Sequence, residues 1–393
     1  MSPARAGQAE FAELVATRRD LHAHPELAFE EHRTAALVAE RLRALGYEVK
    51  TGVGRTGVVG VLGGSGAASR AERTVLLRAD MDALPIREAS EVAYRSTAPG
   101  VMHACGHDAH VAIGLAVARR LAAARAAWHG TVKFVFQPAE ESGNGAEAMV
   151  ADGVLETPAV DAAFGLHVMN HLPIGSIAAT SGAIMGSVDN FTIRITGKGG
   201  HAAMPQDAVD PILAAAHVIT ALQSLVSRTA DPFDQLVVSV TRASAGTTSN
   251  VIPEQAELAG TVRTMGGRLY TEVPERLKAL VNSVAGGLGC GAAVDYVRQT
   301  GATVNDETMT ALVARVAGKV VGPESVLTDA RMLGGEDFSV FLQRVPGCFA
   351  WVGSRNPVKG FDAPHHSPRF DIDEEAMLIG ADLLEGAALE LLR

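Results

Sequence analysis

The densest group of side chains capable of chemistry lies in the stretch MHACGHDAH, residues 102–110, which holds three histidines, a cysteine and an aspartate. Cys105 and His107 stand one residue apart, and a thiolate beside an imidazole suits zinc, manganese or another divalent transition metal. Such a metal lowers the pKa of a thiol enough for the thiolate to form at neutral pH. A cysteine nucleophile with a histidine base is the alternative. A small buried cysteine at the polar start of a helix is a third interpretation.

Two adjacent glutamates, Glu140 and Glu141, follow a strongly apolar run in FVFQPAEE. Such a pair is usually a solvated part of the surface, but this is less expected directly after a buried strand. Adjacent carboxylates diverge at a strand end, so one can bind a metal while the other accepts a proton from water. The pair therefore favours a hydrolytic site.

Further candidate ligands stand at the ends of apolar runs or in loops. These are Asp80 and Asp82 in LRADMDALP, His167 in FGLHV, and His365 and His366 in APHHSPRF. Each has a plain alternative, namely a polar strand end, a hydrogen-bonded core histidine or a surface loop. Together they supply soft, borderline and hard ligands from separate strand ends and loops, which is how a two-metal site is assembled.

The composition limits the class of protein. A chain of 393 residues with 47% hydrophobic residues has room for one large domain or two moderate ones, and it is unlike a disordered chain. A formal net charge of −10 argues against nucleic acid or an anionic membrane surface as the main partner. We therefore expect neither nucleic acid nor a membrane as the partner.

Cysteine usage and hydropathy bear on the compartment. The three cysteines are far apart in sequence, and their odd number leaves no full disulfide set, as in a reducing compartment. The first twenty residues lack an apolar core of signal-peptide length, and we find no apolar run long enough to span a bilayer. We expect a cytoplasmic protein.

Strand and helix patterns alternate in the first part of the chain. Apolar strands are predicted to begin at Thr74, Thr131 and Ala162, with a largely buried helix over 109–127. This alternation predicts an α/β sheet flanked by helices. Ligands gather beyond the carboxyl ends of the strands in such sheets, which is where the acidic pairs fall.

The pattern changes near Ser181. Alternating strands and two helices follow in the order β-α-β-β-α-β, which is that of a ferredoxin-like module. We place this module at 182–299, inserted into an α/β domain made of 1–181 and 300–393. The chain then resumes helix and strand alternation and ends in a helix from about Asp373.

Ten motifs, in chain order, strongly resemble one family. They are RRDLHAHPELAFEE, LRADMDALPI, MHACGHDAH, FVFQPAEE, GLHV, GKGGHAAMP, SNVIPE, GTVRT, GGEDFS and HHSPRF. The family is that of the metal-dependent amidohydrolases, which includes hippurate hydrolases, bacterial N-acyl-L-amino-acid amidohydrolases and plant indole-acetyl-amino-acid hydrolases. It belongs to the wider clan of aminoacylases and zinc carboxypeptidases. The resemblance runs from about Arg18 to the C-terminus.

The resemblance implies a role for each matching residue. The implied metal ligands are Cys105, His107, Glu141, His167 and His366. Glu140 is the implied general acid/base, which takes a proton from the attacking water and returns it to the leaving amine. Asp82 matches an aspartate that orients the site in the wider clan.

The inserted domain supplies further implied residues. His201 of GGHAA would act on the reacting carbonyl, and Asn250 and Arg263 would bind substrate, with Arg263 clamping a free carboxylate. Two positions depart from the pattern: Asp80 replaces a histidine ligand that is usual in the clan, and His365 stands where the family often has an apolar residue.

Fold, activity and cofactors follow from the resemblance as expectations. The fold would be a zinc-peptidase-like α/β catalytic domain with an inserted ferredoxin-like α+β domain for dimerisation or as a lid. The resemblance implies a small-molecule substrate. The reaction would be hydrolysis of N-acyl-L-amino acids, hippurate-like, by two divalent ions per subunit, Mn²⁺ or Zn²⁺ with Co²⁺ or Ni²⁺ as alternatives. The assembly would be a homodimer or a homotetramer.

Other functions remain open at this point. They are a dipeptidase or carboxypeptidase of the same clan, a cysteine-nucleophile hydrolase, and a non-catalytic metal-binding protein.

Overall fold

The chain folds into two compact units. The structure, a computed structural model, describes residues 3–67 and 72–393. The first unit comprises 1–182, 304–331 and 337–393, and the second comprises 183–303 and 332–336. The strands β7 (Gly182–Met185) and β14 (Thr303–Asn305) carry the chain out of the first unit and back.

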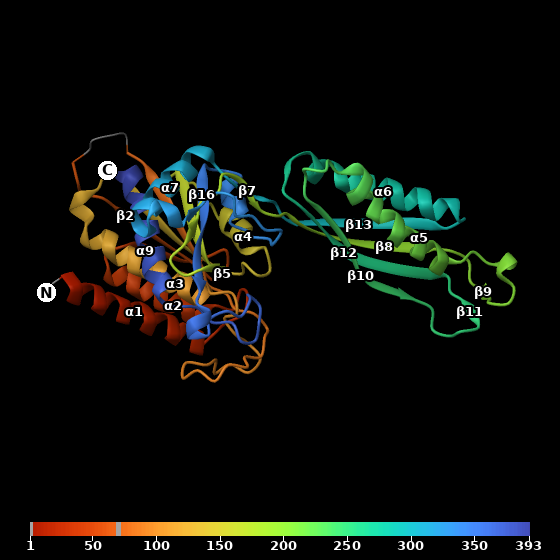
Figure 1. The fold of residues 1–393 in the computed structure, drawn as a ribbon, viewed down its shortest axis with the longest axis horizontal. Coiled ribbons are helices and arrows are strands. Elements are labelled where there is room, and N and C mark those ends of the chain that lie inside the picture. The colour runs from red at the N-terminus through yellow and green to blue at the C-terminus, as the bar shows by residue number, and fades with distance from the viewer. Residues whose placement is uncertain (1–2, 68–71) are drawn as a thin grey trace. The chain divides into compact units, whose positions relative to one another are not determined.

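The first unit is built on an eight-stranded sheet in the order β1-β2-β4-β3-β5-β16-β6-β15 (Figure 1). Strands β4, β3, β5 and β16 are parallel neighbours, so their carboxyl ends share one edge of the sheet. The strand bounds are β1 (Glu48–Val53), β2 (Gly57–Gly63), β3 (Thr74–Asp80), β4 (Thr131–Gln137), β5 (Ala162–Pro173), β6 (Ile177–Ala178), β15 (Val326–Leu327) and β16 (Gly347–Arg355). The predicted α/β sheet is confirmed.

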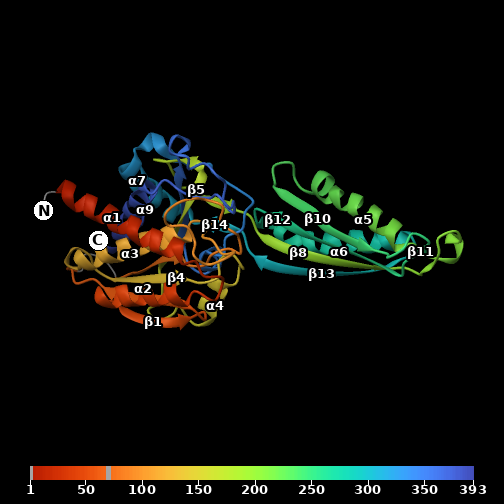
Figure 2. The same cartoon turned by 90° about the horizontal axis from the view of Figure 1, so that it is seen from below.

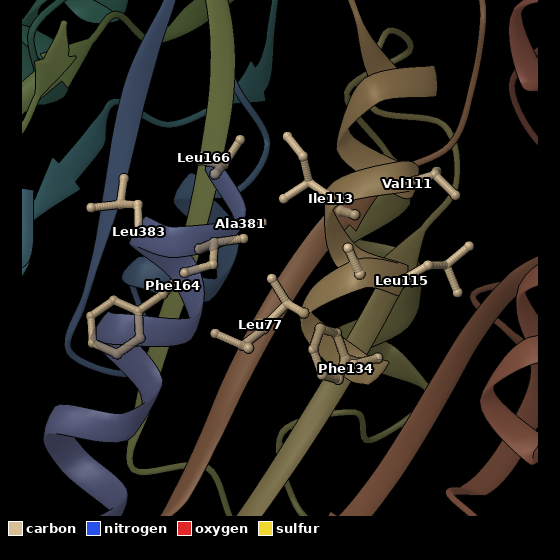
Figure 3. Packing of buried hydrophobic residues seen from close by; sticks show 14 of the residues in the cluster. Leu77, Val111, Ile113, Leu115, Phe134, Phe164, Leu166, Ala381 and Leu383 are labelled. Carbon is tan, nitrogen blue, oxygen red and sulfur yellow. The ribbon is translucent and has the colours of Figure 1, made fainter. Parts of the chain in front are cut away.

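Helices pack on this sheet and on one another. They are α1 (Pro3–Ala23), α2 (His32–Ala44), α3 (His107–Ala123), α4 (Gly145–Ala151), α7 (Glu307–Val321), α8 (Ser339–Leu342) and α9 (Glu375–Leu392). Helix α3 contacts β3, α1 and α9, and it is buried around most of its circumference, which explains its almost continuous apolar sequence. Figure 3 shows Leu77, Ile113, Phe164 and Ala381 in the resulting core. This core fixes β3, β5 and the start of α3 relative to one another.

The second unit has the predicted element order β-α-β-β-α-β. Its elements are β8 (Val188–Thr196), α5 (Pro211–Ser224), β10 (Leu236–Ala245), β12 (Gln255–Thr264), α6 (Gly267–Gly287) and β13 (Gly291–Thr300). The strands form an antiparallel sheet in the order β10-β12-β8-β13, and both helices lie on one face of it (Figures 1 and 2). Phe191, Ile193 and Ile195 alternate along β8 and are buried under the helices, as period-two patterning requires.

One helical segment departs from the expectation that no run is long and apolar enough to span a bilayer. Within the described residues, Pro211–Thr229 has the length and composition of a membrane span, with a mean hydropathy of 1.2 and 28% of it buried. Ala214, Val218 and Leu222 of this segment belong to the core of the second unit. That core therefore accounts for part of its apolar character.

Candidate metal centre

The predicted metal ligands, and the acidic residues predicted beside them, all belong to the first unit and come from strand ends and adjoining turns. Asp80 and Asp82 lie at the end of β3, and Glu140 and Glu141 follow β4. His167 lies on β5, level with the end of β3 because Arg78 of β3 pairs with Gly165. Cys105 lies in the turn before α3, His107 is the first residue of α3, and His366 lies in the loop after β16.

The Cys-Gly-His turn needs its central glycine. Gly106 has φ +93°, in the region that side chains rarely adopt, and an added Cβ would come within 2.4 Å of Val168 Cγ2. The turn therefore closes against β5, and Cys105 Sγ reaches 3.4 Å from His167 Nε2. Helix α3 starts directly at His107.

Two sets of three ligand atoms share the cysteine. The possible ligand atoms of Cys105, His107 and His167 lie within 4.8 Å of one another, and so do those of Cys105, Glu141 and His366. A third such set contains His107, Glu140 and Glu141. The five ligands expected from the resemblance therefore converge on one thiol.

Two buried atoms in these sets test whether the residues fit a metal. His107 Nε2 and Glu141 Oε1 are buried and have no hydrogen-bond partner in the described part of the chain. His366 Nε2 lies 3.4 Å from Glu141 Oε1, within ion-pair distance but outside hydrogen-bond geometry. Buried polar atoms are normally satisfied, and sulfur, imidazole and carboxylate together suit divalent transition metals. The residues fit such an ion.

The carboxylate of Asp82 holds three parts of the centre. Its Oδ1 and Oδ2 accept hydrogen bonds from the backbone amides of Glu140 and Glu141, both at 3.0 Å. His107 Nδ1 lies 2.9 Å from the Asp82 carbonyl oxygen and 3.2 Å from its Oδ1. These bonds hold a proton on Nδ1 and make Nε2 the ring nitrogen that would bind a metal.

Burial and neighbouring charge set the protonation of the ligands. Burial, reinforced by Glu141, raises the pKa of the Cys105 thiol well above its usual range. Burial acts to lower the pKa of His107, but Asp80 and Asp82 outweigh it and hold the pKa well above the usual value. The protein alone therefore keeps protons on both groups, and a metal must displace them in order to bind.

The turn before the glutamates has a strained backbone, which a hydrogen bond to a buried carboxylate stabilises. Ala139 has φ +53°, unusual for a residue with a Cβ. Its amide donates to Glu31 Oε1 at 2.9 Å, and the same buried carboxylate accepts from Phe29 N and from Thr56 Oγ1. Sequence reasoning did not single out Glu31, although it lies in the motif RRDLHAHPELAFEE.

A second group that sequence reasoning missed lies beneath the centre. Arg78 is fully buried and donates to Asp80 Oδ2 at 2.6 Å, to Asp337 Oδ1 at 3.1 Å and to Gln137 Oε1 at 2.9 Å. Asp80 also accepts from His110 Nδ1 at 2.6 Å. Burial raises the pKa of Asp337 to about 6. The signal that could have found this group is that Arg78 interrupts an otherwise apolar strand.

Of the residues predicted in the second unit, His201 and Asn250 lie together, and Arg263 lies apart from them. His201, on β9 (Gly200–His201), pairs with Val251 of β11 (Val251–Ile252), and Ala202 N donates to Asn250 O at 3.1 Å. Figure 1 shows this ribbon beyond one end of the sheet. Arg263 lies near the other end of β12, eight residues beyond Gln255, or roughly 26 Å at 3.3 Å per residue. One small molecule cannot contact both ends of a single copy.

Arg263 itself is half-buried. Its guanidinium makes no hydrogen bond or ion pair with any residue that the structure describes. Burial lowers the pKa of Arg263, and the charge of Asp189 opposes this only in part. Such a cation is available to a ligand.

The centre has a thiol that belongs to two ligand sets, carboxylates beside it, and a position at the strand ends of an α/β sheet. These features are those of a dinuclear metallohydrolase. Residues 76–390 match peptidase family M20/M25/M40, and the chain belongs to this family.

Two relatives and one solved structure place it further. It is 41% identical over 374 residues to IAA-amino acid hydrolase ILR1-like 4 of Arabidopsis thaliana, covering 94% of this chain and 83% of the relative. It is 39% identical over 389 residues to N-acetylcysteine deacetylase of Bacillus subtilis, covering 98% and 99%. Its fold matches the Bacillus subtilis YXEP protein, described as a dinuclear metal binding peptidase of the M20 family, with a TM-score of 0.84, 35% identity and coverage of 98% and 99%.

Proposed function

We propose that this amide hydrolase removes the acyl group from N-acyl amino acids whose α-carboxylate is free. The observation that carries the proposal is the pair of ligand sets sharing Cys105, with Glu140 beside them. The names of the two relatives, an amino-acid conjugate hydrolase and a deacetylase of an acetylated amino acid, support it.

The ligands divide between two ions in this proposal. His107 and His167 would hold one ion and Glu141 and His366 the other, and Cys105 belongs to both ligand sets. Mn²⁺ or Zn²⁺ is the proposed metal, with Co²⁺ or Ni²⁺ as alternatives, because the donor set suits all of them. When bound, two such ions polarise the amide carbonyl and favour ionisation of the attacking water.

Glu140 is the proposed general base and acid. Its side chain is 10% exposed, and Oε2 lies 3.9 Å from His107 Nε2, beside the ligands. From there the carboxylate accepts a proton from the attacking water and returns it to the leaving amine. Arg263 receives the substrate's α-carboxylate, because its guanidinium can bind both oxygens at once.

The second unit is the proposed ferredoxin-like dimerisation and lid domain. His201 and Asn250 lie beyond the Gln255 end of β12, and Arg263 lies roughly 26 Å along that strand from Gln255. All three therefore serve one substrate only if two copies of the chain contribute. Met204, Ile212, Leu213 and Val251 are large apolar side chains that lie exposed on this unit. We propose that a second copy covers such surface in a homodimer, or in a homotetramer built from dimers.

A substrate panel tests the function. Metal-free protein is reloaded with Mn²⁺, Zn²⁺ or Co²⁺, and release of amino acid is measured from hippurate, N-acetyl and longer N-acyl amino acids, and dipeptides. We expect release from at least one N-acyl amino acid and its loss on chelation. Activity that survives chelation and dies with a thiol alkylator would instead indicate a cysteine hydrolase. Cleavage of dipeptides alone would assign the protein to the peptidases of the family.

A further inference from the structure

The backbone of Val168, the residue after His167 on β5, is contacted by three histidine side chains. Its amide donates to His110 Nε2 at 2.9 Å. Its carbonyl oxygen accepts from His167 Nδ1 at 2.6 Å and from His365 Nε2 at 2.9 Å. Its side chain closes against Gly106 in the Cys-Gly-His turn. Val168 is therefore where the turn, the strand and the His-His loop meet.

These hydrogen bonds fix which ring nitrogens carry protons. A carbonyl oxygen only accepts, so both His167 Nδ1 and His365 Nε2 are protonated. His167 Nε2 then keeps its lone pair, 3.4 Å from Cys105 Sγ, and this is the form of imidazole that binds a metal. The group that accepts from the second ring nitrogen of a metal-binding histidine sets the direction of the ring. For His167 that group is a carbonyl shared with His365.

We propose that His365 is a positioning residue of the metal centre, acting on His167 through the shared carbonyl oxygen of Val168. The inference rests on the proposed metal function. The His365 ring is mostly enclosed: its centroid lies 5.3 Å from that of His167 and 4.8 Å from that of Phe370. Packing therefore holds the Nε2–H donor in place, and the donor in turn limits how the carbonyl and the His167 ring can tilt.

Adjacent histidines thereby serve both ligand sets. His366 has φ +63°, unfavourable for a residue with a Cβ, and its amide donates to Ala104 O at 2.8 Å. At this turn the two side chains diverge. His366 Nε2 approaches Glu141, while His365 reaches the carbonyl beside His167. One strained turn thus supports the two halves of the centre, one directly and one through a hydrogen bond.

The opposite side of Val168 is held independently. His110 accepts from the Val168 amide through Nε2, and its Nδ1 donates to Asp80, which Arg78 also contacts. Because this side is anchored in the buried sheet, loss of the His365 donor should disturb the His167 ring without unfolding β5. A variant of His365 can therefore separate positioning from folding.

Cobalt binding tests the proposal. The full-length metal-free protein is titrated with Co²⁺, and bound metal is measured by equilibrium dialysis while visible absorption reports the coordination and the thiolate. The variants are His365→Leu, which lacks the donor, and His365→Gln, whose amide nitrogen can donate in place of Nε2. His171→Leu changes an exposed histidine on the same strand and is the matched control.

We expect the wild type and His171→Leu to bind two ions per chain. His365→Leu should bind one of them 10- to 100-fold more weakly, the usual cost of losing a partner of a metal-binding histidine, with a changed cobalt spectrum. His365→Gln should recover most of the affinity and the spectrum. Circular dichroism and the Tm of the metal-free proteins establish that each variant folds. His365→Phe, which keeps a ring and lacks the donor, replaces His365→Leu if the latter does not fold.

Three results would overturn the inference. Wild-type affinity and spectrum in the variants without the donor would show that the hydrogen bond does not position His167. Equal losses in His365→Gln and His365→Leu would assign the effect to side-chain volume. Failure of the wild type to bind cobalt at all would reject the proposed metal function and this inference with it, whereas two ions bound with wild-type affinity in every protein would reject only the inference.

Discussion

Glu140 and Glu141 are neighbours in the chain, but their amides are bonded to different oxygens of one carboxylate, that of Asp82. This directs one side chain toward His107 and the other toward His366. We expect Glu140→Gln to retain both ions and to lose turnover by about 10²–10⁴-fold, the usual contribution of a positioned base. Metal analysis and kcat on the same preparation measure both effects.

Glu141→Gln is the matched variant, because it makes the same chemical change one residue away. It should lose metal as well as turnover. Nearly full activity in Glu140→Gln, or loss of metal there and not in Glu141→Gln, would mean that the two roles are assigned wrongly.

Arg263 gives a prediction about substrate. If its guanidinium binds the α-carboxylate, then a substrate with that carboxylate amidated leaves the cation without a partner. Losing a charged hydrogen-bond partner costs about 1.5–3 kcal/mol, which is roughly ten- to over a hundredfold in kcat/KM. The wild type should prefer hippurate to its carboxamide by that factor, and Arg263→Ala should lose most of the preference. The four rate constants are measured at one metal concentration.

Arg298→Ala removes a more exposed arginine on the neighbouring part of the sheet and serves as control. Equal rates for acid and amide on the wild type would reject a carboxylate clamp. Preference that persists in Arg263→Ala would keep the clamp but move it to another residue.

At the scale of elements, buried ion pairs connect α1 to the start of α3. Arg18 and His22 of α1 contact Asp108 at 2.9 and 2.8 Å, and His22 Nε2 lies 3.4 Å from Glu88. Burial acts to lower the pKa of His22, but Asp108 and Glu88 outweigh it and raise the pKa to about 8. Because Asp108 follows His107 in the chain, these ion pairs also stabilise the Cys-Gly-His turn.

A pH dependence of stability follows from the direction of this shift. A histidine whose pKa is raised on folding stabilises fully below its unfolded pKa, about 6.5, and loses the effect as pH rises through its folded pKa. The free energy of unfolding should therefore fall by about 2 kcal/mol in total as the pH rises from about 5.5 to about 9, because each pKa unit is worth about 1.36 kcal/mol. Urea unfolding of the metal-free protein across this range measures the fall, and His22→Gln should remove most of it. His24→Gln, a half-exposed neighbour, should leave the slope unchanged; a slope that survives in His22→Gln would assign it to another group.

The elements were largely predictable from sequence, and the hydrogen bonds between them were not. Apolar runs followed by carboxylates predicted β3 and β4, because the pattern of apolar residues reflects burial. They also predicted that the ligands lie at the carboxyl-terminal edge of the sheet. The contact between Arg78 and Asp337 joins residues 259 positions apart, and no local pattern carries it. The resemblance grouped Asn250 with Arg263, but only the register of β12 shows that they lie at opposite ends of the sheet.

At the scale of the whole molecule, the second unit carries the predicted substrate-contacting residues at two opposite ends of its sheet. Arg263 is the penultimate residue of β12. His201 lies on the β9–β11 ribbon at the other end, where it pairs with the exposed Val251 and is close in sequence to the exposed Met204. A dimer in which each copy lends its His201 to the other's metal centre reconciles these positions with one substrate. Such a dimer would also cover apolar side chains that lie exposed on that unit in a single chain.

Mixing two inactive variants tests this arrangement. Glu140→Gln chains lack the base but keep His201, and His201→Ala chains keep the base but lack His201. If His201 acts on the partner, a mixed dimer has one site with both residues intact and one site with neither. Random mixing makes half of the dimers mixed, so activity should return to about a quarter of the wild-type value. Subunit exchange is verified by differently tagged chains that co-purify, and each variant mixed with itself is the control. Activity that stays at the level of the separate variants, in mixtures shown to exchange, would mean that His201 acts within its own chain or not at all.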